Sequence, residues 1–347
     1  MTYTLGIDLH KRSSVWVLLD QDRKTVLEQN VPATKAAIPQ AVAALGVPVD
    51  DVEVAIEPVC GWRWYVEGLE AAGLSVKVAN PSQIRLIADS RIKTDRNDAR
   101  TLADLLRANF FPESYCAPDD VVSLRSLVRE RAFLVSIRTS IKNRLHATVL
   151  SRGYLETVGN PLRVRNKDAM DALADPEIHR TRDLIDDISA RIAFLENDLT
   201  KRMKSDSVAT LLMTMPGVGI VTAGVVCAEV GDFGRFKSGN HLASFAGLVP
   251  SQRSSGNMIR MGNITRKGSA ALRCAMVEAA FRIRPHHPLF EFYDRLAPKI
   301  GKRRARIALA RKMLTILWTM VHNNIPFKEG HTQRMSKRAI STKVLAL

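Results

Sequence analysis

The most constraining feature of this 347-residue chain is the order of extended and helical runs in its first hundred residues. Three apolar, β-branched runs come first, over residues 3–9, 14–19 and 25–31, with polar turn-like stretches between them. Helical and extended patterns then alternate: a helix over about 36–45, a strand over 52–57, a helix over about 62–72, a strand over 75–79, and helices from about Pro81 and about Asp95. A meander followed by βα units predicts a mixed sheet in an α/β domain.

This order is that of a ribonuclease-H-like fold, in which the first and fourth strands are parallel neighbours in the middle of the sheet. Asp8 lies near the end of the first strand and Glu57 ends the fourth, so we expect both at one edge of the sheet. Asp95 and Asp98 begin a later helix that can fold back over that edge. Four convergent carboxylates are the ligands that two hard divalent cations require, so the sequence predicts a site for Mg²⁺ or Mn²⁺.

Asp95 and Asp98 carry less weight when they are considered alone. Residues three apart share one face of a helix, but two acids in a first helical turn are usually solvated groups that complement the helix dipole. Their catalytic interpretation depends on Asp8 and Glu57. The basic side chains around the pair are predicted to contact phosphates; these are Lys93, Arg96 and Arg100.

The charge of the chain indicates a polyanionic partner. The formal net charge is +16, while the 46% hydrophobic and 25% charged content is ordinary for a globular protein. Residues 251–312 contain 15 Lys and Arg against 3 Asp and Glu, a local excess of +12. A concentration this strong favours nucleic acid as the partner.

Other features bear on the compartment. The four cysteines are scattered without metal-ligand spacing, and we expect them to be small buried side chains in a reducing compartment. They are Cys60, Cys116, Cys227 and Cys274. Asp8, His10 and Lys11 interrupt any N-terminal apolar run, so no signal peptide is expected. No apolar stretch is long enough to span a bilayer, and we expect a cytoplasmic, nucleoid-associated protein.

The middle of the chain has the pattern of two long helices. Apolar residues recur at steps of three and four over residues 127–145 and again over residues 185–199, which predicts a coiled-coil seam. The seam can be filled within the chain by a helical hairpin or by a second copy. Seven Arg and Lys residues make the first helix basic, so it can also follow a phosphate backbone.

The C-terminal part contains Pro216-Gly217-Val218-Gly219 between two apolar helical runs. This arrangement resembles a helix-hairpin-helix, in which glycines expose N–H groups to a phosphate at a helix start. A tight helix turn with no ligand is an equally good interpretation of a single motif of this kind.

A serine precedes a glycine at Ser255, in a polar loop where such a residue is normally only a turn former. Basic residues around it can hold a phosphate and stabilise its developing charge. They are Arg253, Arg260, Arg266, Lys267 and Arg273. No general base for the serine hydroxyl is evident nearby; the carboxylate cluster can supply one only if the two domains meet.

Several motifs together resemble the DEDD-type transposases of the insertion-sequence one-ten family, which are related to the Piv- and MooV-type DNA invertases. In the first domain they are Gly6-Ile7-Asp8-Leu9-His10-Lys11, Ile56-Glu57-Pro58, and Lys93-Thr94-Asp95-Arg96-Asn97-Asp98-Ala99-Arg100. In the last they are Phe245-Ala246-Gly247-Leu248-Val249-Pro250, Ser255-Gly256, Gly262-x-Ile264-x-x-Lys267-Gly268, and Leu272-Arg273. The resemblance covers the chain from about Gly6 to about Pro326.

The resemblance implies a site and partners that spacing alone does not supply. The four acids would bind Mg²⁺, and the serine before glycine, which maps to Ser255 with Ser254 adjacent, would be the nucleophile. Members of the family use a structured bridge RNA that pairs with donor and target DNA. The resemblance also implies a dimer or tetramer in which the acids and the serine can come from different subunits.

We therefore expect four segments: a RuvC-like nuclease domain over 1–115, a helical coiled-coil region over 116–205, a serine-containing transposase domain over 206–327, and a basic tail over 328–347. The expected activity is DNA transposition or site-specific recombination through a covalent phosphoserine intermediate. Two alternatives remain at this point. One is a metal-dependent nuclease of the Holliday-junction resolvase type, without a covalent intermediate, and the other is a nucleic-acid-binding scaffold with inert acids.

Overall fold

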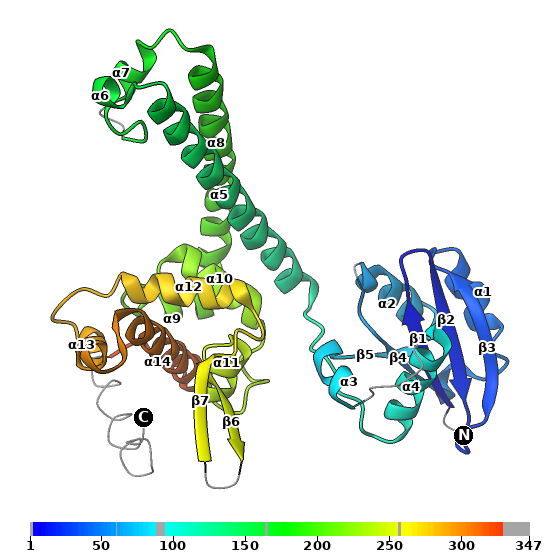
Figure 1. The fold of residues 1–347 in the computed structure, drawn as a ribbon. Coiled ribbons are helices and arrows are strands. Elements are labelled where there is room, and N and C mark those ends of the chain that lie inside the picture. Colours follow the sequence, from blue (N-terminus) through cyan, green and yellow to red (C-terminus); the bar gives the residue numbers. More distant parts are fainter. Residues whose placement is uncertain (1–2, 60, 88–93, 164–165, 256–257, 329–347) are drawn as a thin grey trace. The chain divides into compact units, whose positions relative to one another are not determined.

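The computed structural model describes residues 3–59, 61–87, 94–163, 166–255 and 258–328. The chain divides into two compact units, Met1–Cys116 and Ala117–Leu347. The first unit is built on a mixed β-sheet and the second is mainly helical, as the element labels of Figure 1 show.

The sheet of the first unit has the predicted topology. Its strands are β1 (Tyr3–Leu9), β2 (Ser13–Leu19), β3 (Thr25–Pro32), β4 (Val52–Ile56) and β5 (Ser75–Val78). They lie in the order β3-β2-β1-β4-β5, with β1–β2 and β2–β3 antiparallel and β1–β4 and β4–β5 parallel. The prediction of a mixed sheet with parallel first and fourth strands is therefore confirmed, and this start is consistent with a RuvC-like domain.

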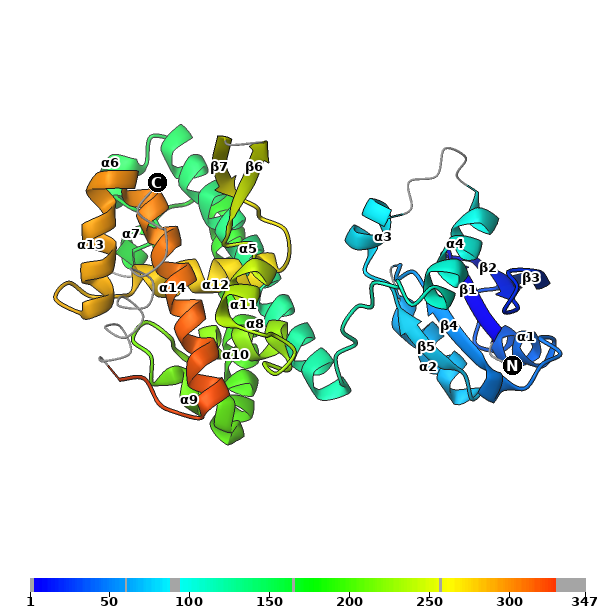
Figure 2. The same ribbon diagram turned by 90° about the horizontal axis from the view of Figure 1, so that it is seen from below.

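Strand periodicity gives the two faces of this sheet different roles. Leu5, Ile7 and Leu9 are buried in a core shared with the helices α1 (Ala37–Ala43) and α2 (Trp62–Ala71). The alternate residues of β1, which include Gly6 and Asp8, face the helix α4 (Asp95–Arg107), which packs on β1 and β2. Figure 2 shows α4 on one side of the sheet and α1 and α2 on the other. Short segments complete the unit: the 3₁₀ turn Val49–Asp51 and the helix α3 (Pro81–Ile87).

Two long helices open the second unit, α5 (Asp119–Ser151) and α8 (Pro176–Ser205), and they pack against each other. Asp175 begins α8 by accepting hydrogen bonds from the N–H groups of Glu177 and Ile178, with Pro176 in the first turn. The predicted seam residues Leu127, Leu195 and Leu199 are buried in one core of this unit. Leu145 and Ile185 are buried in another core, with the short helices α6 (Leu155–Val158) and α7 (Lys167–Asp171). Most of the seam residues pack within the chain, while Leu134, Ile137 and Ile141 are half-buried. Coiled-coil geometry and a second copy at the seam stay predictions.

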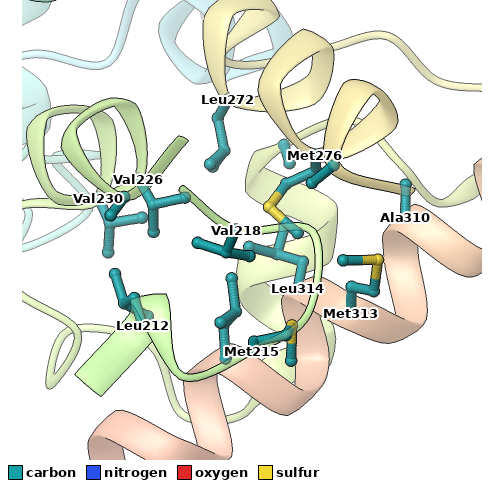
Figure 3. Packing of buried hydrophobic residues seen from close by; sticks show 14 of the residues in the cluster. Leu212, Met215, Val218, Val226, Val230, Leu272, Met276, Ala310, Met313 and Leu314 are labelled. Atoms are coloured by element: carbon teal, nitrogen blue, oxygen red, sulfur yellow. The ribbon is translucent and has the colours of Figure 1, made fainter. Parts of the chain in front are cut away.

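The remaining elements are α9 (Ser207–Met213), α10 (Ile220–Val230), α11 (Gly239–Phe245), β6 (Pro250–Ser255), β7 (Met258–Ile264), α12 (Ala270–Phe281), α13 (Pro288–Ile300) and α14 (Lys302–Asn323). The apolar helix α10 packs against α5, α8, α9 and α12, and the helix α14 packs against α9, α11, α12 and α13. Figure 3 shows Leu212 and Val218, from α9 and the turn after it, packed with Met276 of α12 and Leu314 of α14. This core is the platform that carries the β6–β7 hairpin.

The turn between α9 and α10 contains the glycines of the predicted helix-hairpin-helix. Gly217 has φ +83°, and a Cβ atom there would lie 2.5 Å from the carbonyl oxygen of Ala279 in α12. A larger residue would meet both a backbone penalty and a steric clash. This explains the glycine by packing; the phosphate-binding role of the motif stays a prediction.

The expectation of buried cysteines is wrong for two of them. Cys227 is buried in α10, whereas Cys116 and Cys274 are exposed, and Cys60 lies outside the described residues. Cys274 lies on α12 at a position that does not face the core, since Leu272 and Met276 on the same helix are the buried ones. Among the described residues, no helix is long and apolar enough to cross a membrane. The predicted tail lies outside the described residues from 329 onward.

Candidate active site

The parallel pairing of β1 and β4 brings the first two predicted acids to the same edge of the sheet. Ile7 is the register partner of Ile56, so Asp8 and Glu57 are the next residues along two adjacent strands. Asp8 is nearly buried on the α4 side of the sheet, and Glu57 is half-buried just beyond the end of β4. The predicted strand end at Glu57 is one residue too long.

A close approach of backbone to backbone sets α4 beside Asp8. A Cβ atom built on Gly6 would lie 1.8 Å from the carbonyl oxygen of Ala99, so only glycine lets α4 reach this depth. The helix begins at Asp95 because the Thr94 hydroxyl accepts a hydrogen bond from the N–H of Asn97, at 3.2 Å. Asp95 and Asp98 therefore occupy the first turn of α4, just before Ala99, the residue that contacts Gly6 of β1.

Side-chain contacts with the β2–β3 connection hold α4 in place. Arg23 donates two hydrogen bonds to the carboxylate of Asp104, at 2.9 and 2.8 Å. Arg100 donates to the Thr25 hydroxyl at 3.1 Å and to the Arg23 carbonyl at 3.0 Å. These contacts lie along the body of α4 and fix the direction in which its first turn points.

The other three predicted acids contribute to the electrostatic environment of Asp8. Burial raises the pKa of Asp8 to about 6; His10 opposes the rise, and the charges of Asp95, Asp98 and Glu57 add to it. Within the described part of the chain, none of these four carboxylates pairs with Lys or Arg. The negative charges around the buried Asp8 therefore lack a compensating Lys or Arg among the described residues. A divalent cation could supply the compensating charge.

His10 belongs to this cluster, although no metal-binding role was predicted for it from the sequence. Its Nε2 atom lies 3.2 Å from Oδ2 of Asp8 and 3.1 Å from Oδ2 of Asp95. Asp8, His10 and Asp95 each offer a ligand atom, and these atoms lie within 4.8 Å of one another, a spacing that suits a metal ion. The signal in the sequence was the position of His10 two residues after Asp8, at the same end of the strand. A lone histidine in a polar turn carries little information without the fold.

The basic residues predicted beside the acids have contacts within the first unit. Arg96 pairs with Glu28 of β3, with Nε 2.6 Å from Oε2, and Arg100 binds the β2–β3 connection as described above. Lys93 lies outside the described residues. Contact of these three residues with nucleic acid stays a prediction.

Ser255 is the last residue of β6, at the far end of the hairpin from the helical core. It is the register partner of Met258, the first residue of β7, and Ser254 is the partner of Ile259. The side chains of residues 253–259, which include Arg253 and both serines, and all of residues 256–257 lie outside the description. The backbone thus places Ser255 at the end of a projecting two-stranded ribbon, and its role as nucleophile stays a prediction.

Two glycines at the base of this ribbon hold its motif residues together. Gly268 has φ +100° and a Cβ atom there would lie 1.9 Å from the Phe245 carbonyl oxygen; Gly247 has φ +67° and meets the Lys267 carbonyl oxygen at 2.5 Å. The N–H of Thr265 donates to the carbonyl of Val249 at 2.9 Å. The resembled motifs 245–250 and 262–268 therefore form one interlocked turn.

The predicted phosphate contacts of this region fall into two groups. Arg260, Arg266 and Lys267 are exposed. Arg273 is half-buried and donates to the carbonyl oxygen of Ala246 at 2.9 Å, so it supports the interlocked turn. Nucleic-acid binding by these residues stays a prediction.

Comparison with known proteins identifies relatives along most of the chain. A model of DEDD transposases of the IS110 type matches residues 5–153, and the model of the transposase IS116/IS110/IS902 family matches residues 209–294. The pilin gene-inverting protein of Moraxella bovis is 30% identical over 262 residues, which cover 73% of this chain and 74% of the relative. The transposase for insertion sequence element IS1111A of Coxiella burnetii is 26% identical over 351 residues, 94% of this chain and 91% of the relative. A probable family 20 transposase of Pseudomonas aeruginosa is 25% identical over 300 residues, 80% of this chain and 86% of the relative.

Proposed function

Because this chain belongs to the IS110 family of DEDD transposases, enzymes that transfer DNA strands, we propose a specific division of labour between its two units. The first unit holds divalent metal ions and the second provides a serine nucleophile. The convergence of Asp8, Glu57, Asp95 and Asp98 at one edge of the sheet is the observation that carries this proposal.

The residues of the first unit fit a divalent cation. Asp8 and Glu57 are fixed by the sheet, and Asp95 and Asp98 by the capped first turn of α4. All are hard oxygen donors, which Mg²⁺ and Mn²⁺ prefer. When bound, the cation neutralises charge on the reacting phosphate and lowers the pKa of a hydroxyl near it. The acids themselves would hold and orient the cation. Burial is the main cause of the raised pKa of Asp8, the neighbouring acids add to it, and a cation bound there would favour the ionised carboxylate.

The second unit would carry the covalent step. The Oγ atom of Ser255 attacks a DNA phosphorus, the Oγ–P bond forms, and the bond from phosphorus to a deoxyribose oxygen breaks. The serine proton passes to solvent, and the departing oxygen takes up a proton to become a free hydroxyl. A DNA hydroxyl then attacks the phosphoserine and restores both the serine and the phosphodiester. The bond energy is conserved, so strand exchange needs no nucleoside triphosphate. The reaction requires the acids and the serine at one phosphate, from one chain or from two copies.

A basic surface would bind the nucleic acids. Arg260, Arg266 and Lys267 are exposed near the ribbon that ends in Ser255, within the stretch whose excess charge is +12. We propose that this surface binds element-end and target DNA and also a structured guide RNA, in a dimer or tetramer. The DNA beside the gene tests the guide: it should encode a non-coding RNA whose two internal loops match the element end and the insertion site.

A trapping experiment tests the covalent step. Purified protein is incubated with Mg²⁺, the flanking non-coding RNA and end-labelled DNA of the element ends, and SDS-resistant protein–DNA adducts are measured. Ser255→Ala is expected to abolish the adduct, Asp8→Asn to abolish both adduct and cleavage, and Ser254→Ala, the matched control, to retain adduct formation. Metal-dependent cleavage that persists in Ser255→Ala would instead support a nuclease without a covalent intermediate.

A further inference from the structure

His10 occupies a position between two of the proposed metal ligands from two different elements. Its Nε2 atom is almost equidistant from a carboxylate oxygen of Asp8, on β1, and one of Asp95, on α4. Its backbone N–H donates to the Ser13 carbonyl at 2.8 Å, which closes the turn between β1 and β2 and limits how far the ring can move. The His10 ring is 43% exposed, between the 10% of the Asp8 side chain and the 60% of the Asp95 side chain, so it lies at an intermediate depth in the cluster.

The geometry of this nitrogen suits a shared cation better than a pair of hydrogen bonds. A neutral imidazole nitrogen carries either one proton or one lone pair, so its N–H reaches two oxygens only as a bifurcated hydrogen bond, in which neither N–H···O angle is close to linear. Neighbouring ligands of an octahedral cation with bonds of about 2.1 Å lie about 3.0 Å apart. The observed separations of 3.2 and 3.1 Å are close to that edge length.

A nitrogen ligand changes which cation the site selects. Mg²⁺ binds almost only oxygen, whereas imidazole is a good ligand for first-row transition metals, so one histidine among carboxylates shifts preference away from Mg²⁺. Mn²⁺ accepts both donor types and keeps the octahedral geometry.

We propose that His10 coordinates a divalent cation directly, together with Asp8 and Asp95, and that it makes the site prefer Mn²⁺ over Mg²⁺. This inference rests on the proposed metal-dependent function and specifies its ligand set. Asp8 and Asp95 supply oxygen from the strand and the helix, and His10 supplies the nitrogen that distinguishes the two cations.

Mn²⁺ itself is the probe for the test, with the full-length protein. Electron spin-echo envelope modulation of bound Mn²⁺ detects a directly coordinated nitrogen, and ¹⁵N-histidine labelling identifies it as histidine. Titrations monitored by electron paramagnetic resonance give Mn²⁺ affinity, and competition gives Mg²⁺ affinity. His10→Gln keeps a hydrogen-bond donor but removes the ring nitrogen; His146→Gln, on α5 of the other unit, is the control.

The expected results concern coupling and selectivity. The wild type and His146→Gln show a ¹⁴N coupling that changes on ¹⁵N-histidine labelling, and His10→Gln loses it. Loss of even an outer-sphere partner of a metal site costs about 10–100-fold in affinity. We therefore expect His10→Gln to weaken Mn²⁺ binding at least about tenfold and Mg²⁺ binding much less.

Two outcomes separate this inference from the proposed function. If no histidine nitrogen couples to Mn²⁺, or if His10→Gln weakens both cations equally, the inference is wrong while the carboxylate site stands. If Asp8→Asn binds Mn²⁺ as tightly as the wild type does, the metal site is not at this edge of the sheet and both proposals fail.

Discussion

Asp8 is a nearly buried carboxyl whose charged neighbours include three other acids, and this environment disfavours its ionised form. The backbone position of Asp8 follows from strand pairing. The free-energy cost of ionising its carboxyl depends on burial beneath α4 and on the nearby charges of Asp95 and Asp98. Burial and the neighbouring negative charges both disfavour the ionised carboxylate, and a cation bound in the proposed site would offset this cost. The candidate site thus combines a buried carboxyl with neighbouring negative charges, an arrangement that a bound divalent cation would stabilise.

The first prediction concerns how the ionisation of Asp8 changes the free energy of unfolding with pH. The pKa of Asp8 is raised from 3.8 to about 6 in the folded protein, so the folded state holds the proton more tightly than the unfolded state. The stability penalty is absent below the lower value, grows as pH rises between the two, and is complete above about pH 6. We expect Asp8→Asn to raise the free energy of unfolding of the metal-free protein by about 1–3 kcal/mol at about pH 8 and to change it little near pH 4.

Urea unfolding in the presence of a chelator measures this effect. Tryptophan fluorescence is a suitable signal for the first unit, because Trp16, Trp62 and Trp64 belong to it and only Trp318 belongs to the second. An equal change in stability at both pH values would contradict a titrating Asp8. With Mn²⁺ added at about pH 8 the order should reverse, since the variant loses a metal ligand.

Helix α4 completes the candidate site, because it places Asp95 and Asp98 beside the sheet residues Asp8 and Glu57. Its depth is set by Gly6 against Ala99, its first residue by the Thr94 cap, and its direction by Arg23 and Arg100. None of these contacts involves the side chain of Asp95 or Asp98, so each acts on these acids through the position of the helix. Because Asp95 and Asp98 occupy the first turn, a small displacement of α4 moves two of the proposed ligands together.

The second prediction is that Gly6→Ala displaces α4. The added Cβ atom would overlap the Ala99 carbonyl, and neither backbone has room to shift without losing the contact. We expect a loss of about 1–3 kcal/mol in the free energy of unfolding and, in protein that still folds, Mn²⁺ binding weakened at least about tenfold. Urea unfolding and Mn²⁺ titration measure the two effects.

Gly46→Ala is the control, because it lies in the same unit and a Cβ atom there meets nothing within 4 Å. Its φ of +69° makes the substitution cost about 1 kcal/mol of stability, with metal affinity unchanged. Equal metal affinity in Gly6→Ala and wild type would show that α4 depth does not position the acids.

Across the whole molecule the dominant property is the net charge of +16 and its concentration in residues 251–312. Part of this positive charge is used within the protein. Arg129 pairs with the buried Glu229 at 2.9 Å and links α5 to α10, while Arg306 lies 3.8 Å from the ring centroid of Tyr293 and donates to the Ala280 carbonyl. Exposed cations such as Arg266 and Lys267 differ from these in facing solvent. Net charge alone therefore overstates how many cations a nucleic acid meets.

The third prediction separates the two kinds of cation by salt dependence. Each phosphate contact adds about 0.9 to the slope of log affinity against log salt concentration for duplex DNA. The double variant Arg266→Ala/Lys267→Ala should reduce that slope by about 2. Fluorescence anisotropy with duplex DNA from about 50 to about 200 mM KCl measures it.

The matched control removes two cations that already pair with a carboxylate one helical turn away. Arg63 pairs with Glu67 at 3.1 Å, and Arg202 pairs with Asp198 at 3.1 Å. We expect Arg63→Ala/Arg202→Ala to leave the slope unchanged. Equal reductions in both double variants would mean that binding senses net charge rather than the surface near the ribbon.

The sequence by itself determined the sheet and the place of Asp8 and Glu57 on it. Alternation of side chains and the order of strands are local and topological properties, and parallel neighbours necessarily end at the same edge. A helix from about Asp95 was also predicted, whereas its cap by the Thr94 hydroxyl comes from the structure. Only the tertiary structure decided that His10 turns toward Asp8 and Asp95, that Arg100 and Arg273 turn inward to backbone carbonyls, and that Gly6 admits α4 to contact distance. These outcomes depend on the direction of a side chain and on the distance between two backbones. The spacing of residues in the sequence specifies neither the direction nor the distance.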